Sequence, residues 1–383
     1  MKIHGIISVQ ASNMNVCAEK NQFRVGKSAF FLCIYVTHEQ NLHALVTTIT
    51  IDQGVTPLEY MAIKIFVIGV KVGQLSYSHQ VYPVDTGQLS VQTRALDGAE
   101  QVLHFLHGNG FAVRTYSALL ESLAEQSGMI LQDAAGHGLS PAGEGFVGWE
   151  ASSKRFQSVL EQLVQPQWRS LVGVGHSFGG CMTLLMSIRN PQLFEQTVLL
   201  DPALYPEEMI EQLMHANEQE KRQQSMLVRQ TERRRTTWPS MQDACEQLRG
   251  RGTFVGWEER CLEDYVNFST YETQTGERHL CCPPWLEAAV FGSAPEMLWR
   301  DISKLKTPTY IVWGTQTLDV FQQSYQRIRQ EGSDIRFVEV QGGHCFMMQY
   351  PTQSARLVRA LIDQNVDEIR ALQHSGFVIN FDD

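Results

Sequence analysis

The spacing of hydrophobic residues divides residues 75–201 into short strands and helices. Residues 75–82 and 89–96 alternate polar and apolar side chains, as half-buried strands do, and the turn at 85–87 predicts an antiparallel pair. Further along, continuous apolar runs alternate with amphipathic stretches. We expect strands over residues 101–106, 129–133, 171–175 and 197–201, and helices over 118–126, 149–164 and 179–188. This alternation predicts an α/β fold with a mostly parallel sheet and helices on both faces.

The alternation stops after Pro202. Residues 206–300 are mostly polar and helical in pattern, and no strand of the core type is expected among them. The helices expected there cover 207–235, 241–249 and 258–267. Strands then resume at 309–313 and 335–340, with helices at 321–330 and 355–369. We therefore predict a core made of residues 61–202 and 301–383, interrupted by a helical cap, residues 203–300.

Residues 1–60 hold two short β-like runs, 30–36 and 46–51, but no long periodic segment and no residue pattern that carries chemistry. Two interpretations are open for them. They form a loosely packed N-terminal extension, or the natural protein begins at Met61.

Composition narrows the range of functions. The chain has 383 residues and a net charge of −10, which argues against a nucleic-acid-binding protein. No apolar run approaches the roughly 18 residues of a membrane helix, so no stable membrane insertion is expected. The eight cysteines include no C-x-x-C pair, which favours free thiols in a reducing compartment. We expect a cytoplasmic protein, and the sequence does not indicate its oligomeric state.

The strongest chemical signal is Ser177 in the pattern G-x-S-x-G, residues 175–179. An apolar strand precedes it and a helix rich in small residues follows. Glycines on both sides allow a sharp strand-to-helix turn that lifts the serine hydroxyl above the sheet edge. Ser177 is therefore the expected nucleophile.

Two further glycine-containing turns supply the partners that such a serine needs. His107-Gly108-Asn109-Gly110 follows a buried strand, so we expect the N–H groups of Asn109 and Phe178 to form an oxyanion hole. His344 follows two glycines after the last expected strand, where a late loop can reach Ser177. It is the expected general base.

With these motifs in this order, residues 75–373 resemble the α/β-hydrolase family. The resemblance implies an eight-stranded, mostly parallel sheet, with the cap between strands 6 and 7. The segment 133–140 also resembles a family loop, usually D-x-R-G-x-G-x-S, with Ala135 in place of the arginine. That loop is largely structural in the family, so His137 receives no catalytic role.

The sequence leaves two candidates for the acid that orients His344. Family members often carry it as G-x-x-D after the strand that follows the cap, but Thr317 occupies that position here. A neutral hydroxyl cannot stabilise an imidazolium. Asp319 lies two residues later, and Asp201 ends the strand before the cap, where some relatives place the acid. We favour Asp201 and keep Asp319 as the alternative.

Aromatic residues near these motifs are candidates for substrate binding, although each is more commonly a core residue. The candidates are Phe111, His176, Trp257, Trp285 and Phe346.

The predicted function is a serine hydrolase that cleaves a carboxylic ester of a small molecule through an acyl-enzyme. No metal or organic cofactor is implied. Ser177 argues against epoxide hydrolases and dehalogenases, which use an aspartate at this turn. A thioesterase, a C–C bond hydrolase with the same residues, and a non-catalytic protein that binds a small ligand are the alternatives.

Overall fold

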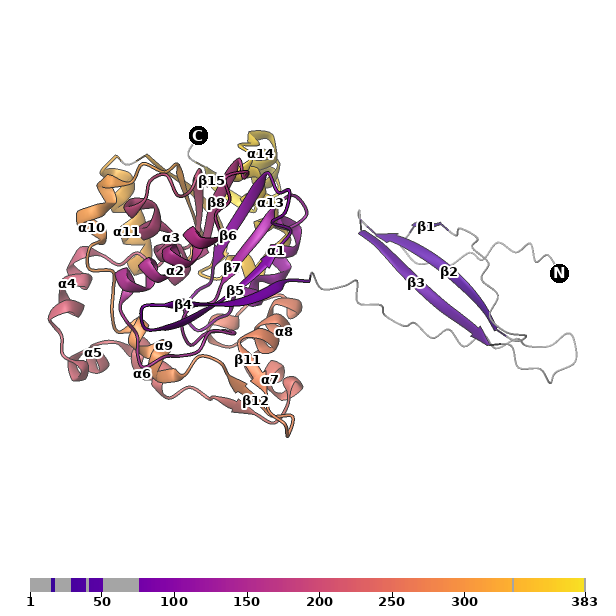
Figure 1. The fold of residues 1–383 in the computed structure, drawn as a ribbon, viewed down its shortest axis with the longest axis horizontal. Helices are drawn as coiled ribbons and strands as arrows, with labels where there is room; N and C mark the ends of the chain where they lie inside the picture. The colour runs from indigo at the N-terminus through magenta and orange to yellow at the C-terminus, as the bar shows by residue number, and fades with distance from the viewer. Residues whose placement is uncertain (1–14, 18–28, 39–40, 51–75, 333, 382–383) are drawn as a thin grey trace, which may run out of the picture. The chain divides into compact units, whose positions relative to one another are not determined.

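The computed structural model describes residues 15–17, 29–38, 41–50, 76–332 and 334–381 (Figure 1). Its contacts divide the chain into two units, Met1–Ser76 and Tyr77–Asp383. In the first unit, β1 (Asn15–Cys17), β2 (Ala29–His38) and β3 (Asn41–Thr50) form an antiparallel sheet in that order. Residues 61–75, where we expect the core to begin, lie outside the described residues.

The second unit is built on a nine-stranded sheet with the order β15-β14-β13-β9-β8-β6-β7-β5-β4. The six strands from β14 to β7 are parallel, and the remaining pairings are antiparallel. The strands are β4 (Ser78–Val84), β5 (Gly87–Arg94), β6 (Gln101–Leu106), β7 (Gly128–Gln132), β8 (Ser170–His176), β9 (Gln196–Leu200), β13 (Thr309–Gln316), β14 (Ile335–Gly343) and β15 (Val378–Phe381).

The predicted α/β fold with a mostly parallel sheet is confirmed, but the expected count of eight strands is one too low. The additional strand is β15, which pairs antiparallel with β14 at the edge of the sheet. It has only four residues, and two of them are exposed. So short an edge strand has no alternation long enough to predict it from sequence.

Helices cover both faces of this sheet. Helices α2 and α3 pack together, as do α1 and α13, and Figure 1 shows the two pairs on opposite sides of the strands. The helical segments of the core are η1 (Val113–Tyr116), α1 (Ser117–Leu123), α2 (Trp149–Leu163), α3 (Phe178–Arg189), α11 (Asp319–Gln330), α12 (Phe346–Gln349), α13 (Pro351–Ile362) and α14 (Val366–His374). The helix expected over 355–369 is wrong in its extent, because Gln364, at φ +52°, separates α13 from α14.

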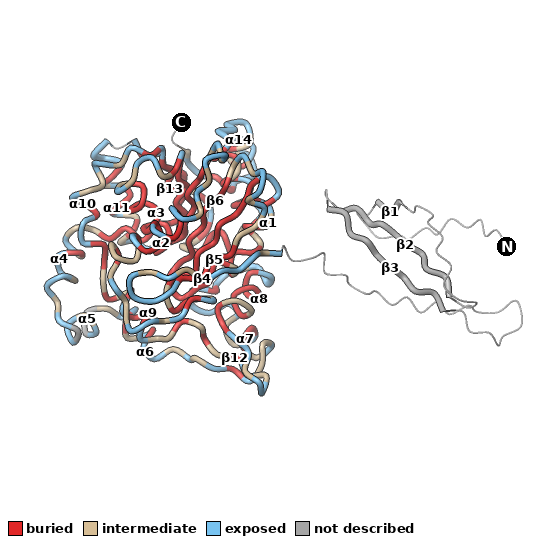
Figure 2. Tube along the Cα trace, in the orientation of Figure 1, coloured by how far each residue is buried: buried red, intermediate tan, exposed pale blue. Residues whose placement is uncertain are grey.

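Between β9 and β13 lies the inserted segment, residues 202–308. It contains α4 (Glu207–His215), α5 (Glu218–Gln224), α6 (Met226–Glu232), β10 (Thr237–Trp238), α7 (Met241–Leu248), η2 (Gly252–Phe254), α8 (Glu259–Phe268), β11 (Thr270–Glu272), β12 (Arg278–Leu280), α9 (Pro284–Phe291), α10 (Leu298–Asp301) and η3 (Ile302–Lys304). Figure 2 shows that burial is concentrated along the sheet, whereas α4 and α5 carry long exposed stretches.

One expectation for the inserted segment is wrong. The single helix over 207–235 is three helices, because Asn217 and Ser225 cap new helix starts by accepting hydrogen bonds from backbone N–H groups. The segment also contains a small antiparallel sheet, β10-β12-β11. Its strands have two or three residues each, too few for a periodic pattern.

Two features bear on the predicted cellular environment. Within the described part of the chain, no helix has the length and apolar character needed to cross a bilayer. The six cysteines whose side chains are described carry free thiols: Cys181, Cys245, Cys261, Cys281, Cys282 and Cys345.

Candidate active site

Ser177 lies at the turn between β8 and α3, in a backbone conformation that few residues other than glycine adopt. Its φ is +52° and its ψ is −115°. The turn is crowded, because a Cβ on Gly175 would meet the backbone of Gly179, and one on Gly179 would meet the end of β6. The Ser177 N–H donates to the carbonyl oxygen of Leu200 at 3.0 Å, which ties the turn to the end of β9. These contacts explain why glycine is required on both sides of the serine.

The His344 imidazole bridges Ser177 and Asp201. Its Nε2 lies 3.0 Å from Ser177 Oγ, and its Nδ1 lies 3.1 Å from Asp201 Oδ1. Because a carboxylate only accepts hydrogen bonds, Nδ1 carries the proton in the neutral ring, and Nε2 is free to accept from the serine hydroxyl. The late loop after β14 thus meets the turn after β8 and the end of β9.

Asp201 is fully buried and is held by donors from the strand and helix that follow the inserted segment. Its Oδ1 accepts from the Thr317 hydroxyl at 2.5 Å and from the Tyr325 hydroxyl at 3.1 Å, and its Oδ2 accepts from the Gly314 N–H at 3.0 Å. With His344 Nδ1, four donors face the two oxygens. This set offsets the cost of burying a carboxylate away from water.

The alternative acid, Asp319, lies elsewhere. It is exposed and begins α11, whereas Asp201 faces His344. Thr317, in the position where relatives often carry the acid, donates its hydroxyl to Asp201. Among the two candidates, the structure therefore brings Asp201 to the histidine and leaves Asp319 in solvent.

The loop after β6 forms the opposite side of the site. Gly110 has a φ of +81°, and its N–H donates to His137 Nε2 at 3.0 Å. The Asn109 side-chain amide donates to the carbonyl oxygen of Glu287, in α9 of the inserted segment, at 3.0 Å. Among the hydrogen bonds of the described residues, neither the Asn109 N–H nor the Phe178 N–H is a donor. Both N–H groups thus lack a hydrogen-bond acceptor among the described residues.

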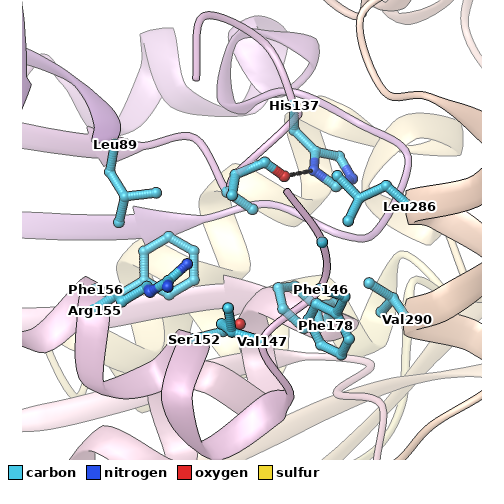
Figure 3. A pocket seen from close by; sticks show the side chains of 13 residues that line it. Leu89, His137, Phe146, Val147, Ser152, Arg155, Phe156, Phe178, Leu286 and Val290 are labelled. Carbon is cyan, nitrogen blue, oxygen red and sulfur yellow. Dashed lines mark hydrogen bonds between the residues drawn. The ribbon is translucent and has the colours of Figure 1, made fainter. Parts of the chain in front are cut away.

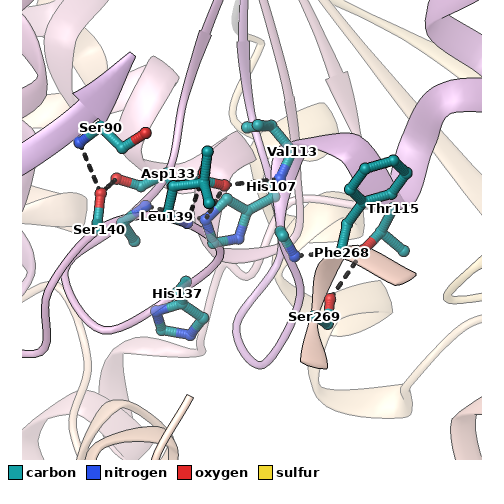
Figure 4. A network of polar contacts seen from close by, with 12 residues as sticks. Ser90, His107, Val113, Thr115, Asp133, His137, Leu139, Ser140, Phe268 and Ser269 are labelled. Carbon is teal, nitrogen blue, oxygen red and sulfur yellow. Dashed lines mark hydrogen bonds and ion pairs between the residues drawn. The ribbon is translucent and has the colours of Figure 1, made fainter. Parts of the chain in front are cut away.

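A buried polar network lies beside this loop (Figure 4). Asp133 accepts from the N–H groups of Val113 and Leu139, at 2.9 and 3.1 Å. Burial raises the pKa of Asp133 to about 6, and burial lowers the pKa of His107 to about 3 and that of His137 to about 4. Both histidines are therefore neutral near pH 7, which lets His137 Nε2 act as an acceptor for Gly110.

Comparison with known proteins identifies the fold family. The model of the family described as "Alpha/beta hydrolase family" matches residues 105–357. The chain belongs to the α/β hydrolase family.

Individual relatives match this chain only in part. "Abhydrolase domain-containing protein AKT2" of Alternaria alternata is 33% identical over 101 residues, 26% of this chain and 34% of that protein. "sn-1-specific diacylglycerol lipase ABHD11" of Mus musculus is 30% identical over 122 residues, 30% of this chain and 38% of that protein. The matched region spans about a third of the length of these relatives.

Solved structures agree over a longer stretch at low identity. The chain superimposes on E-2-(acetamidomethylene)succinate hydrolase with a TM-score of 0.59 at 17% identity, covering 75% of this chain and 100% of that one. For a Mycobacterium tuberculosis esterase the TM-score is 0.55 at 21% identity, with coverages of 74% and 92%. At these identities the likeness concerns the fold alone.

The aromatic residues expected to bind substrate lie in different environments in this chain. Phe111 and Trp257 make an edge contact, with ring centroids 5.6 Å apart, beside the buried Tyr265. Trp285 is half exposed, and Phe346 is fully buried, where it is a packing residue. Thus Phe111 and Trp257 form one aromatic cluster with Tyr265, whereas Phe346 is inaccessible to a substrate.

His176 is engaged by the protein on both sides. Its Nδ1 lies 2.6 Å from the Tyr116 hydroxyl, and its Nε2 lies 3.0 Å from the carbonyl oxygen of His344. Burial holds the pKa of His176 well below its usual range, so the ring is neutral. These bonds leave no ring nitrogen for a substrate and instead anchor the loop that carries His344.

Sequence reasoning missed the contacts that join the inserted segment to the site. Glu287 forms a two-oxygen ion pair with Arg234, at 2.7 and 2.6 Å, and a Cβ on Gly110 would meet Glu287 Oε1. Arg234 and Glu287 are 53 positions apart, and no local pattern links them.

Within the described part of the chain, no three His, Cys, Asp or Glu side chains are grouped so that they could hold a metal ion.

Proposed function

We propose that the protein is a serine hydrolase that cleaves a carboxylic ester through an acyl-enzyme intermediate. The observation that carries the proposal is the placement of one imidazole, that of His344, 3.0 Å from Ser177 Oγ and 3.1 Å from Asp201 Oδ1. A serine hydroxyl is a poor nucleophile near neutral pH, and a base within hydrogen-bond distance overcomes that limit.

In this mechanism Ser177 Oγ attacks the ester carbonyl carbon while its proton passes to His344 Nε2. Asp201 stabilises the imidazolium that forms and keeps its Nδ1–H oriented. The carbonyl oxygen becomes an oxyanion, which accepts from the N–H groups of Phe178 and Asn109. His344 then protonates the leaving alcohol. Water attacks the acyl-enzyme by the same route and releases the acid.

The test compares the wild-type protein with Ser177→Ala on p-nitrophenyl butyrate. We expect the variant to lose about 10⁴-fold or more in kcat, because the nucleophile is absent. Ser187→Ala is the matched control. Ser187 is also buried, within α3, and its hydroxyl donates to the carbonyl oxygen of Thr183, so this variant should retain turnover.

A serine-directed fluorophosphonate gives a second readout that does not depend on the choice of ester. The wild-type protein should gain one phosphonyl group on Ser177, detected by mass spectrometry of the peptide. Absence of both turnover and labelling in folded protein would reject the serine-hydrolase function and favour a ligand-binding protein.

A further inference from the structure

The inserted segment contacts the core in more than one region. Leu286 and Val290 of α9 line a small cavity together with Phe178 of the core (Figure 3). Residues 252–258, which include η2 and end where α8 begins, instead bond to the loop and short helix that follow β14. Neither these residues nor His344 line the cavity, so the contacts around His344 are distinct from those of α9.

The Gln349 side chain joins the loop that carries His344 to the inserted segment. Gln349 is the last residue of α12. Its Oε1 accepts from the N–H of Gly343, the residue before His344, at 2.9 Å. Its Nε2 donates to the carbonyl oxygen of Val255, 94 positions earlier in the chain, also at 2.9 Å. One amide thus bonds at the same time to the loop of the proposed base and to the inserted segment.

Two glycines give the Gln349 amide room to approach both backbones. Gly342 has a φ of +122°, and a Cβ there would lie 2.6 Å from Gln349 Oε1. Gly256 has a φ of +75°, and a Cβ there would lie 3.1 Å from Gln349 Nε2. Because positive φ and close approach both favour glycine, the backbone on each side of the amide fits this contact.

Further contacts connect the same parts of the chain. The Thr253 hydroxyl lies 3.4 Å from Sγ of Cys345, the residue after the proposed base. The Glu258 N–H donates to the carbonyl oxygen of Met348 at 2.9 Å. The inserted segment therefore borders the loop of the base at more than one residue.

The His344 imidazole has two distances to keep, 3.0 Å to Ser177 Oγ and 3.1 Å to Asp201 Oδ1. The backbone of its loop is held at one place by His176, whose Nε2 lies 3.0 Å from the His344 carbonyl oxygen, and at the preceding residue by Gln349. A displacement of about 1 Å at a reacting group lowers the rate by up to about 10²-fold. Loss of a support next to the ring should therefore be visible in kcat.

We infer that Gln349 is a positioning residue that acts at two places: its Oε1 fixes the loop of His344, and its Nε2 fastens residues 252–258 of the inserted segment to that loop. The inference rests on the proposed function and names the side chain through which the inserted segment is tied to the base.

The test separates the two ends of the amide with two substitutions. Gln349→Met removes both bonds, whereas Gln349→Glu keeps an acceptor for the Gly343 N–H and loses the donor to Val255. Gln349→Met should lower kcat for p-nitrophenyl butyrate at least about tenfold with KM within about twofold, since both bonds are to the protein. The rate of Ser177 labelling by a fluorophosphonate should fall with it. Gln349→Glu should retain kcat within about threefold.

Hydrogen exchange of the peptide that covers residues 252–258 reports the other end of the amide. In both variants this peptide should exchange about fivefold faster than in the wild type, the factor that corresponds to the loss of one typical hydrogen bond. Urea titration of each variant confirms that the protein assayed is folded. A merely structural role would lower the free energy of unfolding and leave kcat of the folded protein unchanged.

Gln196→Met is the matched control. Gln196 is a buried glutamine at the start of β9, and its amide donates to the carbonyl oxygen of Ile362 at 2.7 Å. It therefore makes the same kind of tie between distant segments, at the end of β9 opposite to Asp201. Its kcat should stay within about twofold of wild type, with unchanged exchange of residues 252–258.

The outcomes separate this inference from the proposed function. Wild-type turnover with an unchanged kcat in Gln349→Met, or an equal loss in Gln349→Glu and Gln349→Met, would overturn the role of Oε1. Unchanged exchange of residues 252–258 in both variants would overturn the role of Nε2. A wild-type protein that neither turns over esters nor reacts with a fluorophosphonate would overturn the proposed function, and the role of Gln349 with it.

Discussion

The core and the inserted segment contribute to the site in different ways. The core places Ser177, His344 and Asp201 on loops that leave the ends of parallel strands, and several hydrogen bonds hold each loop. The inserted segment contacts the loop after β6 through the Glu287 carbonyl oxygen of α9 and through the Trp257 ring. Under the proposed function, the groups that must hold a reacting geometry therefore come from the sheet, and the inserted segment contributes contacts around them.

The largest effect should come from the core. Asp201→Asn should lower kcat by about 10⁴-fold, because an amide at this position favours the wrong histidine tautomer. Steady-state hydrolysis of p-nitrophenyl butyrate measures the loss. Asp319→Asn is the control and should leave kcat within about twofold, since Asp319 is exposed at the start of α11.

Reversal of these two results would identify Asp319 as the acid that orients His344. A sharper version adds Thr317→Asp to Asp201→Asn. Thr317 Oγ1 already lies 2.5 Å from the carboxylate of Asp201, so the new acid should recover part of the lost turnover.

The next effect concerns how the inserted segment is attached. Arg234→Ala removes one partner of a largely buried ion pair and leaves the Glu287 carboxylate, which is 5% exposed, without its cation. We expect a loss of about 3 kcal/mol in the free energy of unfolding, measured by urea titration. Arg249→Ala, at an exposed pair with Glu259, should leave the free energy of unfolding nearly unchanged. Equal losses would mean that the Arg234 pair is no more important than a surface contact.

The buried histidines of the core should make its stability depend on pH. Burial lowers the pKa values of His104 and His137 to about 4 and of His107 to about 3, and it lowers that of His176 strongly. Between pH 6.5 and 4 the unfolded chain binds protons at these rings and the folded protein does not, so stability falls as pH falls.

Two carboxyl groups oppose this trend. Burial raises the pKa of Asp133 to about 6 and that of Asp264 to about 7, so the folded protein holds protons there that the unfolded chain has released. Near pH 5 the unfolded chain therefore binds about two more protons than the folded protein, about four at the histidines less about two at the carboxyl groups. The free energy of unfolding should fall by roughly 2–3 kcal/mol for each pH unit of acidification. Urea unfolding at pH 5, 6 and 7 measures the slope. Stability that rises on acidification would contradict the burial of these histidines.

The smallest effect tests the support of the oxyanion loop. His137→Leu removes the acceptor of the Gly110 N–H and a contact to the Asn109 side chain, and it leaves Ser177 and His344 in place. Since loss of a direct oxyanion donor costs about 10²–10³ in kcat, displacement of the loop should cost about tenfold, with KM little changed. His137→Gln keeps an acceptor and should recover part of the rate. A change in KM alone would assign His137 to substrate binding.

The alternation of strands and helices was predictable because it depends on periodicity over five to fifteen neighbouring residues. The Ser177 turn and the loops at 107–110 and 342–344 were also recognisable, because tight turns require glycine at particular positions. The short strands β10, β11, β12 and β15 were not, since two to four residues carry no measurable period.

The sequence by itself determined the α/β architecture, the candidate nucleophile and the candidate base. Only the tertiary structure decided which aspartate meets His344, because Asp201 and Asp319 differ in their distance to that ring and not in any local pattern. It also decided that Phe346 is inaccessible. The physical reason is the same in each case: hydrogen bonds and burial depend on contacts between segments more than a hundred residues apart, and local sequence does not encode those distances.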